Sequence, residues 1–209
     1  MIKLATVDNQ SGASSPVAAV VLAAGGSKRM GQAKQLLPVD GQPMVRRVVQ
    51  AVCQAGLAQV VVVVGAEGER VARALADLDL EIVHNHAWEQ GMSTSLRAGL
   101  NALRPEIEAA LLVLADQPGL TPAMLSAVMD AYRTSRAPIV APFYRGRRGN
   151  PVLFARALFA ELGRVEGDKG GRVLLVRYEQ NVTRVDLDDK AILLDVDTRQ
   201  DYEGLCSER

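Results

Sequence analysis

Residues 17–34 read VAAVVLAAGGSKRMGQAK, and this stretch decides the fold. Its first eight residues are apolar and do not alternate with polar ones, which is typical of a parallel strand buried on both faces of a sheet. A glycine-rich loop with the cations Lys28, Arg29 and Lys34 follows directly. Ligands of open α/β sheets bind where such strands end. The stretch therefore predicts a buried strand that leads into an anion-binding loop.

Similar strand patterns recur along the chain and are separated by segments with helical periodicity. Further strands are expected at 59–64, 81–85, 109–115 and 138–143, and helices at 44–54, 67–76, 92–103 and from Thr121 and Pro122 onward. Strands that alternate with helices at this spacing are joined by right-handed crossovers. The sequence predicts a three-layer α/β fold, with a mostly parallel central sheet and helices on both faces.

The pattern after residue 143 is less regular. A short strand is expected at 151–154, short helices at 156–162 and 172–178, and a terminal helix at 201–205. Residues 182–187 alternate between apolar and polar side chains, so we expect a half-exposed strand there, antiparallel to the others. No repeat or long linker divides the chain. We therefore expect a single domain over 16–209 and a flexible polar tail over 1–15.

The composition excludes several classes of protein. Hydrophobic residues make up 48% and charged residues 23%, which is the balance of an ordinary globular chain rather than a disordered one. Lys and Arg number 24 and Asp and Glu number 24, so the chain lacks the basic surplus of a duplex DNA binder. The apolar runs are too short for a bilayer span. We expect a cytoplasmic protein with neither a nucleic-acid nor a membrane partner.

Two cysteines, Cys53 and Cys206, are too few for a secreted scaffold held by disulfides. We expect both to be free thiols, with Cys53 buried on a helix. Residues 1–15 lack the apolar core of a signal peptide, which agrees with that interpretation.

The loop after the first strand has the residues of a polyphosphate cradle. Gly25, Gly26 and Gly31 allow backbone amides to approach a ligand and to adopt positive φ, and Ser27 adds a hydroxyl. Spacing excludes two better-known glycine motifs. The dinucleotide fingerprint needs a glycine two residues after Gly26, where Lys28 stands, and the P-loop needs lysine where Gln32 stands. The alternative is a surface loop with solvated cations. The position of the loop and its density of charge favour the cradle.

Three aspartates are candidate metal or substrate ligands. Asp116 ends a predicted buried strand, and Mg²⁺ is held by one or two carboxylates together with substrate phosphates. By itself, however, an Asp that caps the turn before Pro118 is the simpler explanation. Asp195 and Asp197 alternate along an extended segment, so they point to the same face. Either of them could equally cap the terminal helix through Thr198.

Two further segments lie at predicted helix starts. Gly91–Ser93 follows a strand and begins a helix, which favours an anion or ribose contact there. Trp88 either contacts the ligand or is a packed anchor. His84 and His86 form an H-x-H pair, but a transition-metal site needs a third ligand that the sequence does not supply.

A basic loop indicates an acidic substrate. Arg145, Arg147 and Arg148 lie together in a chain of zero net charge, although solvated arginines explain them almost as well. Gly170 and Gly171 precede a helix with Arg172 in its first turn, an arrangement suited to a phosphate.

The segment L-A-A-G-x-S-x-R-M-G-x-x-K at 22–34 resembles the signature of nucleotidyltransferases with the Rossmann-like fold of the molybdenum cofactor nucleotidyltransferases. Further segments resemble one branch of this family, the molybdenum cofactor cytidylyltransferases. These segments are WEQGMSTSL (88–96), LLVLADQP (111–118), RRGNPVLF (147–154), GDKGGR (167–172) and DVDTRQDY (195–202). The resemblance is collinear from about residue 17 to 204. The Ala-Ala-Gly form resembles the cytidylyl enzymes, whereas guanylyl relatives usually show Leu-Ala-Gly-Gly. Departures at Thr94, Gly171 and Arg199 fall on no expected catalytic group.

The resemblance implies a Mg²⁺-dependent transfer of CMP from CTP to the phosphate of molybdenum-loaded molybdopterin, which gives molybdopterin cytosine dinucleotide and pyrophosphate. The attacking phosphate is already an anion, so catalysis would consist of alignment and charge neutralisation. A molybdoenzyme of the xanthine dehydrogenase type, or its chaperone, is an implied partner. Alternatives are a guanylyltransferase, another small-molecule or sugar-phosphate nucleotidyltransferase, and a cofactor-binding chaperone without turnover.

The resemblance also implies roles for individual residues. Catalytic roles fall to Arg29 at the leaving pyrophosphate, Lys34 at the α-phosphate, and Asp116; these intact residues argue against the chaperone. The implied nucleotide-binding residues are Leu22, Ala23, Ala24, Gly25, Gly26, Ser27, Arg29, Lys34, Gly91, Met92 and Ser93. The implied acceptor-binding residues are Arg148, Asn150, Pro151, Asp168 and Arg172. The implied metal ligands are Asp116 and Asp197, of which Asp197 resembles the late ligand of related folds better than Asp195 does.

Overall fold

The computed structural model describes residues 15–27 and 30–207. The predicted tail therefore lies outside the described residues except for Ser15, and Lys28 and Arg29 lie outside them as well. The Ser15 side chain is buried, and its hydroxyl accepts a hydrogen bond from the Arg136 guanidinium. The separation of a tail from a single domain stays a prediction.

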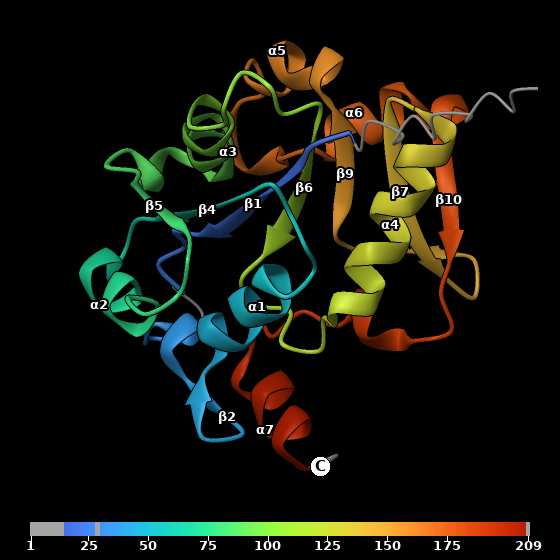
Figure 1. The fold of residues 1–209 in the computed structure, drawn as a ribbon. Helices are drawn as coiled ribbons and strands as arrows, with labels where there is room; N and C mark the ends of the chain where they lie inside the picture. The colour runs from blue at the N-terminus through green and yellow to red at the C-terminus, as the bar shows by residue number, and fades with distance from the viewer. Residues whose placement is uncertain (1–14, 28–29, 208–209) are drawn as a thin grey trace, which may run out of the picture.

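The central layer is one sheet with the strand order β10-β7-β9-β6-β1-β4-β5 (Figure 1). The strands are β1 (Val17–Ala23), β4 (Gln59–Val64), β5 (Glu81–His84), β6 (Ala109–Leu114), β7 (Ile139–Tyr144), β9 (Val152–Ala155) and β10 (Val182–Asp186). All of them run parallel except β9, which is antiparallel to both of its neighbours, β6 and β7. The short β8 (Arg147–Arg148) pairs antiparallel with β7. The predicted mostly parallel sheet is confirmed.

The direction expected for the strand at residues 182–187 is wrong. β10 pairs in parallel with β7, with Val182 opposite Ile139. β9 runs opposite to β7 and so ends at the starting end of the sheet, from which β10 begins after the intervening helices. The antiparallel strand is instead β9, which follows β7 through short turns and enters from the opposite end. The alternation of residues 182–187 indicates a half-exposed edge strand, which β10 is, but it carries no information about the direction of the strand.

Helices cover both faces of the sheet. One face carries α1 (Met44–Cys53), α2 (Gly68–Ala74) and α4 (Pro122–Ser135), and the other carries α3 (Met92–Asn101), α5 (Phe159–Leu162) and α6 (Arg172–Arg177). Figure 1 shows α3 and α5 on the side opposite α1 and α2. Val17, Ala19 and Val21 of β1 pack in the first layer, whereas Ala18 and Val20 pack in the second. The three-layer architecture is therefore confirmed.

Helix α3 approaches the sheet unusually closely at Gly99. A Cβ atom added at Gly99 would collide with the side chain of Val20 in β1 and would lie 3.0 Å from that of Val63 in β4. The absent side chain lets α3 lie against the two central strands, and so it fixes the height of the α3 N-terminus above the carboxyl edge.

Short elements complete the chain. The 3₁₀ helices are η1 (Lys34–Leu36), η2 (Trp88–Gln90), η3 (Arg156–Leu158), η4 (Gly167–Lys169), η5 (Glu179–Asn181) and η6 (Lys190–Leu193), and a hairpin joins β2 (Pro38–Val39) to β3 (Gln42–Pro43). The C-terminal helix α7 (Arg199–Ser207) packs on this hairpin, where the Tyr202 hydroxyl donates to the Pro38 carbonyl over 2.6 Å. The C-terminus is thereby tied to the segment that follows the glycine loop.

Two smaller expectations concern the cysteines and membrane-spanning helices. Both cysteines are free, but Cys53 is only half-buried because it occupies the last turn of α1. Among the helices of the described residues, none combines the length and apolar character needed to cross a membrane.

Candidate active site

A cavity of about 590 Å³ opens at the carboxyl ends of β1 and β6. Of the predicted nucleotide-binding residues, its walls include Leu22, Ala24, Gly25, Gly26, Ser27, Lys34, Gly91 and Met92. Ala23 and Ser93 are buried behind the wall, and Arg29 lies outside the described residues. The cavity is located where open α/β sheets bind their ligands.

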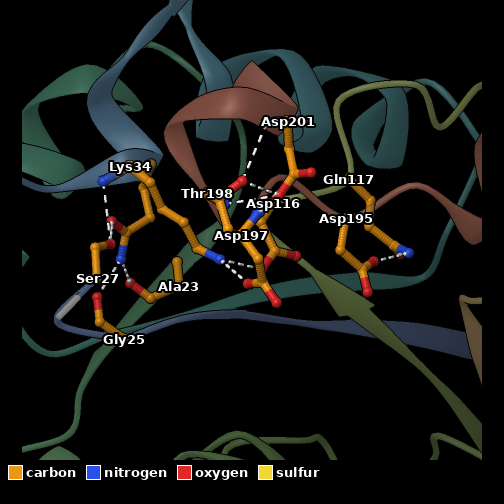
Figure 2. A network of polar contacts seen from close by, with 11 residues as sticks. Ala23, Gly25, Ser27, Lys34, Asp116, Gln117, Asp195, Asp197, Thr198 and Asp201 are labelled. Carbon is orange, nitrogen blue, oxygen red and sulfur yellow. Dashed lines mark hydrogen bonds and ion pairs between the residues drawn. The ribbon is translucent and has the colours of Figure 1, made fainter. Parts of the chain in front are cut away.

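A lysine bridges two of the predicted metal ligands. Lys34 Nζ donates to Asp116 Oδ2 and to Asp197 Oδ1, each over 2.7 Å (Figure 2). The Lys34 side chain is only 15% exposed. Burial opposes its charge, but the Asp116 charge and the hydrogen bonds to both carboxylates outweigh burial and raise the pKa of Lys34. Lys34 is therefore a stable cation at the floor of the cavity.

The third aspartate joins the same cluster. Gln117 Nε2 donates to Asp195 Oδ1 over 2.5 Å, and the Val196 amide donates to the Asp116 carbonyl over 2.9 Å. These bonds hold the C-terminal segment against the loop after β6. Burial, followed by the charge of Asp116, raises the pKa of Asp195. Among the described residues that line the cavity, these three carboxylates outnumber the single lysine beside them.

The residues at this floor fit a divalent cation that is shared with a phosphate ligand. Asp116 Oδ1 is buried and has no hydrogen-bond partner among the described residues. Mg²⁺ takes oxygen ligands and binds through one or two carboxylates plus substrate phosphates. In the described part of the chain, no three His, Cys, Asp or Glu side chains converge on one point as an all-protein metal site. Two carboxylates, one of them with an oxygen that has no partner among the described residues, fit a Mg²⁺ ion that also binds substrate phosphates.

The N-terminus of α7 is capped by Thr198 and Asp201, and not by the side chain of Asp195 or Asp197. Asp201 Oδ2 accepts hydrogen bonds from the Thr198 amide (2.7 Å) and the Asp197 amide (3.1 Å), and the Thr198 hydroxyl accepts one from the Asp201 amide (3.2 Å). This is a reciprocal capping box at the start of α7. The cap belongs to Thr198 and Asp201, so the side chains of Asp195 and Asp197 face the cavity.

A buried glutamine, which the sequence analysis did not single out, shapes the glycine loop. Gln35 Nε2 donates to the carbonyls of Ala23 (3.2 Å) and Gly25 (2.6 Å), and Gln35 Oε1 accepts from the Ser27 hydroxyl (3.2 Å). Ser27 Oγ in turn accepts from the Lys34 amide over 3.1 Å. The loop carbonyls are thus tied to the protein interior. A lone glutamine beside Lys34 has no periodicity that could have identified it.

The glycines of the loop act differently from the expectation. Ser27 and Gly31 adopt positive φ angles of 49° and 65°, whereas Gly25 and Gly26 do not. Gly26 instead allows a close approach, because a Cβ atom there would lie 2.8 Å from Trp88 Cζ3. Trp88 therefore packs on the loop, as the anchor interpretation expected, and it also lines the cavity; its contact with a ligand stays a prediction.

The predicted anion site at the start of α3 is already engaged by the protein. Gly91 is the N-cap, and the Met92 amide donates to Asp168 Oδ1 over 3.0 Å. Asp168 therefore satisfies one of the free amides at the helix start. The structure places Asp168 in the cavity wall as expected of an acceptor-binding residue, but its partner is a backbone amide.

The remaining acceptor-binding candidates do not line the cavity. Arg148, Asn150, Pro151 and Arg172 are absent from the lining. Burial lowers the pKa of Arg148, and the neighbouring positive charge of Arg172 lowers it further, so the two guanidinium groups lie near each other. Within the described ranges, neither arginine forms an ion pair. Two of the predicted acceptor-binding residues, Arg148 and Arg172, are thus neighbouring cations in the structure.

The H-x-H pair does not develop into a metal site. β5 ends at His84, and the ring of His86 stacks on it with centroids 6.4 Å apart. No third metal-ligating side chain joins them within the described ranges.

Parallel strands that end in an amide-rich loop and in carboxylates beside a lysine place the protein among the α/β enzymes that act on nucleotides. Comparison with known proteins narrows this class. Residues 19–182 match the MobA-like NTP transferase domain, and the chain belongs to this family. The resemblance seen in the sequence is confirmed at this level, and the protein is a nucleotidyltransferase.

Curated relatives carry several names. The chain is 35% identical over 192 residues to the nicotine blue oxidoreductase of Paenarthrobacter nicotinovorans, an alignment that covers 87% of this chain and 92% of that one. It is 26% identical over 190 residues to the molybdenum cofactor cytidylyltransferase of Escherichia coli, with 90% and 94% covered. The bifunctional protein GlmU of Rhizobium etli is 31% identical over 79% of this chain, which spans only 34% of its length.

Solved structures agree on the fold. Rv0371c of Mycobacterium tuberculosis superposes with a TM-score of 0.83 at 32% identity, and the match covers 93% of this chain and 99% of that one. The manganese complex of the same protein superposes with a TM-score of 0.80 at 31% identity, covering 93% and 100%. The Rossmann-like nucleotidyltransferase fold is thereby confirmed.

Proposed function

We propose that the protein transfers CMP from CTP to the phosphate of molybdenum-loaded molybdopterin and releases pyrophosphate. The observation that carries the proposal is the junction of Lys34 with Asp116 and Asp197, directly beside the glycine loop. This junction supports the proposal, because it combines a cation with carboxylates that would hold a second cation beside the bound triphosphate. The molybdenum cofactor cytidylyltransferase of Escherichia coli, which aligns over 90% of this chain, supports the choice of substrates.

The proposed chemistry needs alignment and charge neutralisation. The triphosphate lies on the amides of the glycine loop, with Lys34 at the α-phosphate and Arg29 at the leaving pyrophosphate. Asp116 and Asp197 hold Mg²⁺, which supplies positive charge to the phosphates. The manganese complex of Rv0371c supports a divalent ion in this fold. The acceptor phosphate is already an anion, so no residue need serve as a general base.

The acceptor end is proposed to lie at Arg148 and Arg172. Val152 pairs with Leu112 in β6 across an antiparallel ladder, so the residues before Val152 extend toward the carboxyl end of β6, where Asp116 lies. An acidic cavity floor would repel a phosphate acceptor unless nearby cations offset it. The two guanidinium groups, which form no ion pair with the residues that the structure describes, supply that charge, while Asn150, Pro151 and Asp168 shape the approach.

The preference for CTP over GTP is proposed from the base side of the cavity. Ala24 lines it, and its side chain narrows the space that the glycine of the guanylyl form would leave for a purine. A guanylyl enzyme and a sugar-phosphate nucleotidyltransferase use the same floor, and no contact in the structure favours either. A molybdoenzyme of the xanthine dehydrogenase type, or its chaperone, is the proposed receiver of the product.

A second candidate activity follows from one relative. The nicotine blue oxidoreductase aligns over 87% of this chain, and its name describes a reduction–oxidation reaction. The lysine–aspartate junction favours nucleotidyl transfer, so we place the redox activity second. The two activities consume different substrates and are separable in one experiment.

The test is a competition. Equal concentrations of CTP and GTP are supplied with Mg²⁺ and molybdenum-loaded molybdopterin, and the dinucleotide products are identified by mass spectrometry. We expect the cytosine product to predominate; equal products or a guanine preference would refute the choice of nucleotide. Reduction of nicotine blue with a supplied reductant is assayed in parallel, and turnover there without any dinucleotide would favour the second candidate.

Arginine variants test the acceptor end. Arg148→Gln and Arg172→Gln are each expected to lower kcat/KM for the acceptor while leaving KM for CTP near the wild-type value. Arg145→Gln is the matched control, because Arg145 stacks on Tyr144 in the exposed β7–β8 turn. Equal effects of all three changes would contradict the assignment of Arg148 and Arg172 to the acceptor end.

A further inference from the structure

Lys34 occupies the space in which the carboxylates would share a divalent cation. Its Nζ lies 2.7 Å from Asp116 Oδ2 and 2.7 Å from Asp197 Oδ1, oxygens that come from two distant segments of the chain (Figure 2). A metal ion bridging the same two oxygens would lie beside this ammonium group. Like charges at such a separation repel strongly in a partly buried site. The lysine and the metal therefore exclude each other from this position.

Among the described residues that line the cavity, Lys34 is the one lysine or arginine beside these carboxylates. Asp195 contributes a further carboxylate to the same cavity, and Asp116 Oδ1 remains buried with no partner among the described residues. One ammonium group thus neutralises part of the cluster and occupies the bridging oxygens. The cluster keeps its affinity for a stronger cation, provided that Lys34 moves.

The attachment of Lys34 allows such a movement. Its amide is held by Ser27 Oγ over 3.1 Å, so the backbone stays beside the glycine loop. The four-carbon side chain carries a compact charge on a flexible stem that can turn from the carboxylates toward the loop. A triphosphate bound to the loop would offer Lys34 another anion at the place where the loop amides point.

We propose that Lys34 is an internal counter-ion of Asp116 and Asp197 that keeps free divalent cations out, so that the metal ion enters together with the nucleotide. The ligand class of this site is then a metal–nucleoside triphosphate complex, with metal and nucleotide binding cooperatively. Differential contacts of Lys34 with the carboxylates and with the phosphates are the source of the coupling. The inference rests on the proposed location of the nucleotide, but it requires neither CTP nor molybdopterin as the substrate.

The test measures binding of Mn²⁺ alone, as a paramagnetic probe, to the full chain without nucleotide. Titration followed by electron paramagnetic resonance is expected to show weak binding to the wild type and at least about tenfold tighter binding to Lys34→Met, because the competing charge is gone. The control is Arg70→Met, which removes an equal charge from an exposed pair with Glu67 and should match the wild type. Unchanged or weaker binding in Lys34→Met would overturn the proposal.

Two further variants keep the test decisive. Lys34→Gln retains a donor toward the carboxylates without the charge, and it makes the same measurement if Lys34→Met fails to fold. Adding Asp116→Asn to either variant should abolish the gain in Mn²⁺ affinity, which shows that the ion binds at this floor. A gain that survives in the double variant would place the ion elsewhere and reject the proposal. Neither result depends on which nucleotide the enzyme uses, so failure here is distinct from failure of the proposed function.

Discussion

Lys34 contacts Asp116 and Asp197, which lie 82 and 163 residues away along the chain. The glycine loop and Asp116 were predictable because each follows a buried strand, and strand ends of a parallel sheet share one edge. Gln35 and Gln117 were not predictable, since each bonds to groups that only the folded chain brings near. Residue-scale prediction therefore located the residues that a strand end marks and missed those that orient them.

Replacing Asp116 tests the metal site directly. Asp116→Asn keeps the shape of the side chain but removes the charge, and we expect kcat to fall by about 10²–10³-fold, as for other losses of an electrostatic element at a reacting phosphate. Steady-state kinetics at saturating Mg²⁺ measures the effect. Asp77→Asn, the same change in an exposed ion pair, is the control and should retain full turnover. Wild-type turnover in Asp116→Asn would show that the assignment is mistaken.

Gln35 tests whether the loop geometry matters for binding. Gln35→Leu leaves the carbonyls of Ala23 and Gly25 without their donor, and it should lower the free energy of unfolding by about 1–3 kcal/mol. Because the loop loses its anchor, nucleotide affinity measured by calorimetry should fall as well. Gln54→Leu, at an exposed position after α1, should change stability by no more than about 0.5 kcal/mol. Wild-type nucleotide affinity in Gln35→Leu would show that the Gln35 hydrogen bonds do not contribute to nucleotide binding.

At the scale of elements, pattern and direction carry different information. Periodicity located β1, β4 and β6 to within a residue or so, because strands buried on both faces must be apolar throughout. It did not give the direction of β10, since alternation depends on exposure and direction depends on the connection. The capping box at the start of α7 was likewise readable as Thr198-x-x-Asp201, yet the sequence left the cap open to Asp195 and Asp197.

The junction of α1 and α2 gives a prediction of pH dependence. Arg46 donates to both oxygens of Asp77, over 2.6 and 2.7 Å, and to the Ala74 carbonyl. The hydrogen bonds from Arg46 lower the pKa of Asp77 from 3.8 to about 2. A lowered carboxyl pKa adds stability above the ordinary pKa, and this stability is lost as pH falls through 3.8 toward 2.

Thermal melting of the wild type and Asp77→Asn at several pH values checks this prediction. We expect the variant to melt at a lower temperature near pH 7, and the difference to shrink as the pH falls below 3.8. The effect should be small, because the pair is exposed and screened by solvent. A difference that stays constant down to pH 3 would mean that the Arg46 contacts do not stabilise the folded chain through the Asp77 charge.

At the scale of the whole molecule, three distant segments meet in one cavity: the loop after β1, the end of β6 and the stretch before α7. The fold class followed from the alternation of strands and helices. The position of β9 between β6 and β7 did not, because a strand inserted in the reverse direction leaves no periodic signal. By its antiparallel pairing with β6, β9 brings the residues before Val152 toward the carboxyl end of β6, so the proposed acceptor end depends on topology that only the structure displays.

The central claim is that this cavity transfers a nucleotidyl group to a phosphate acceptor. The most direct measurement is pyrophosphate release by the wild-type enzyme with Mg²⁺ and each of CTP, GTP, ATP and UTP, with and without molybdenum-loaded molybdopterin. The account predicts release that depends on the acceptor, is fastest with CTP and is nearly lost in Asp116→Asn. Absence of acceptor-dependent pyrophosphate with all four nucleotides, from a folded enzyme, would contradict it.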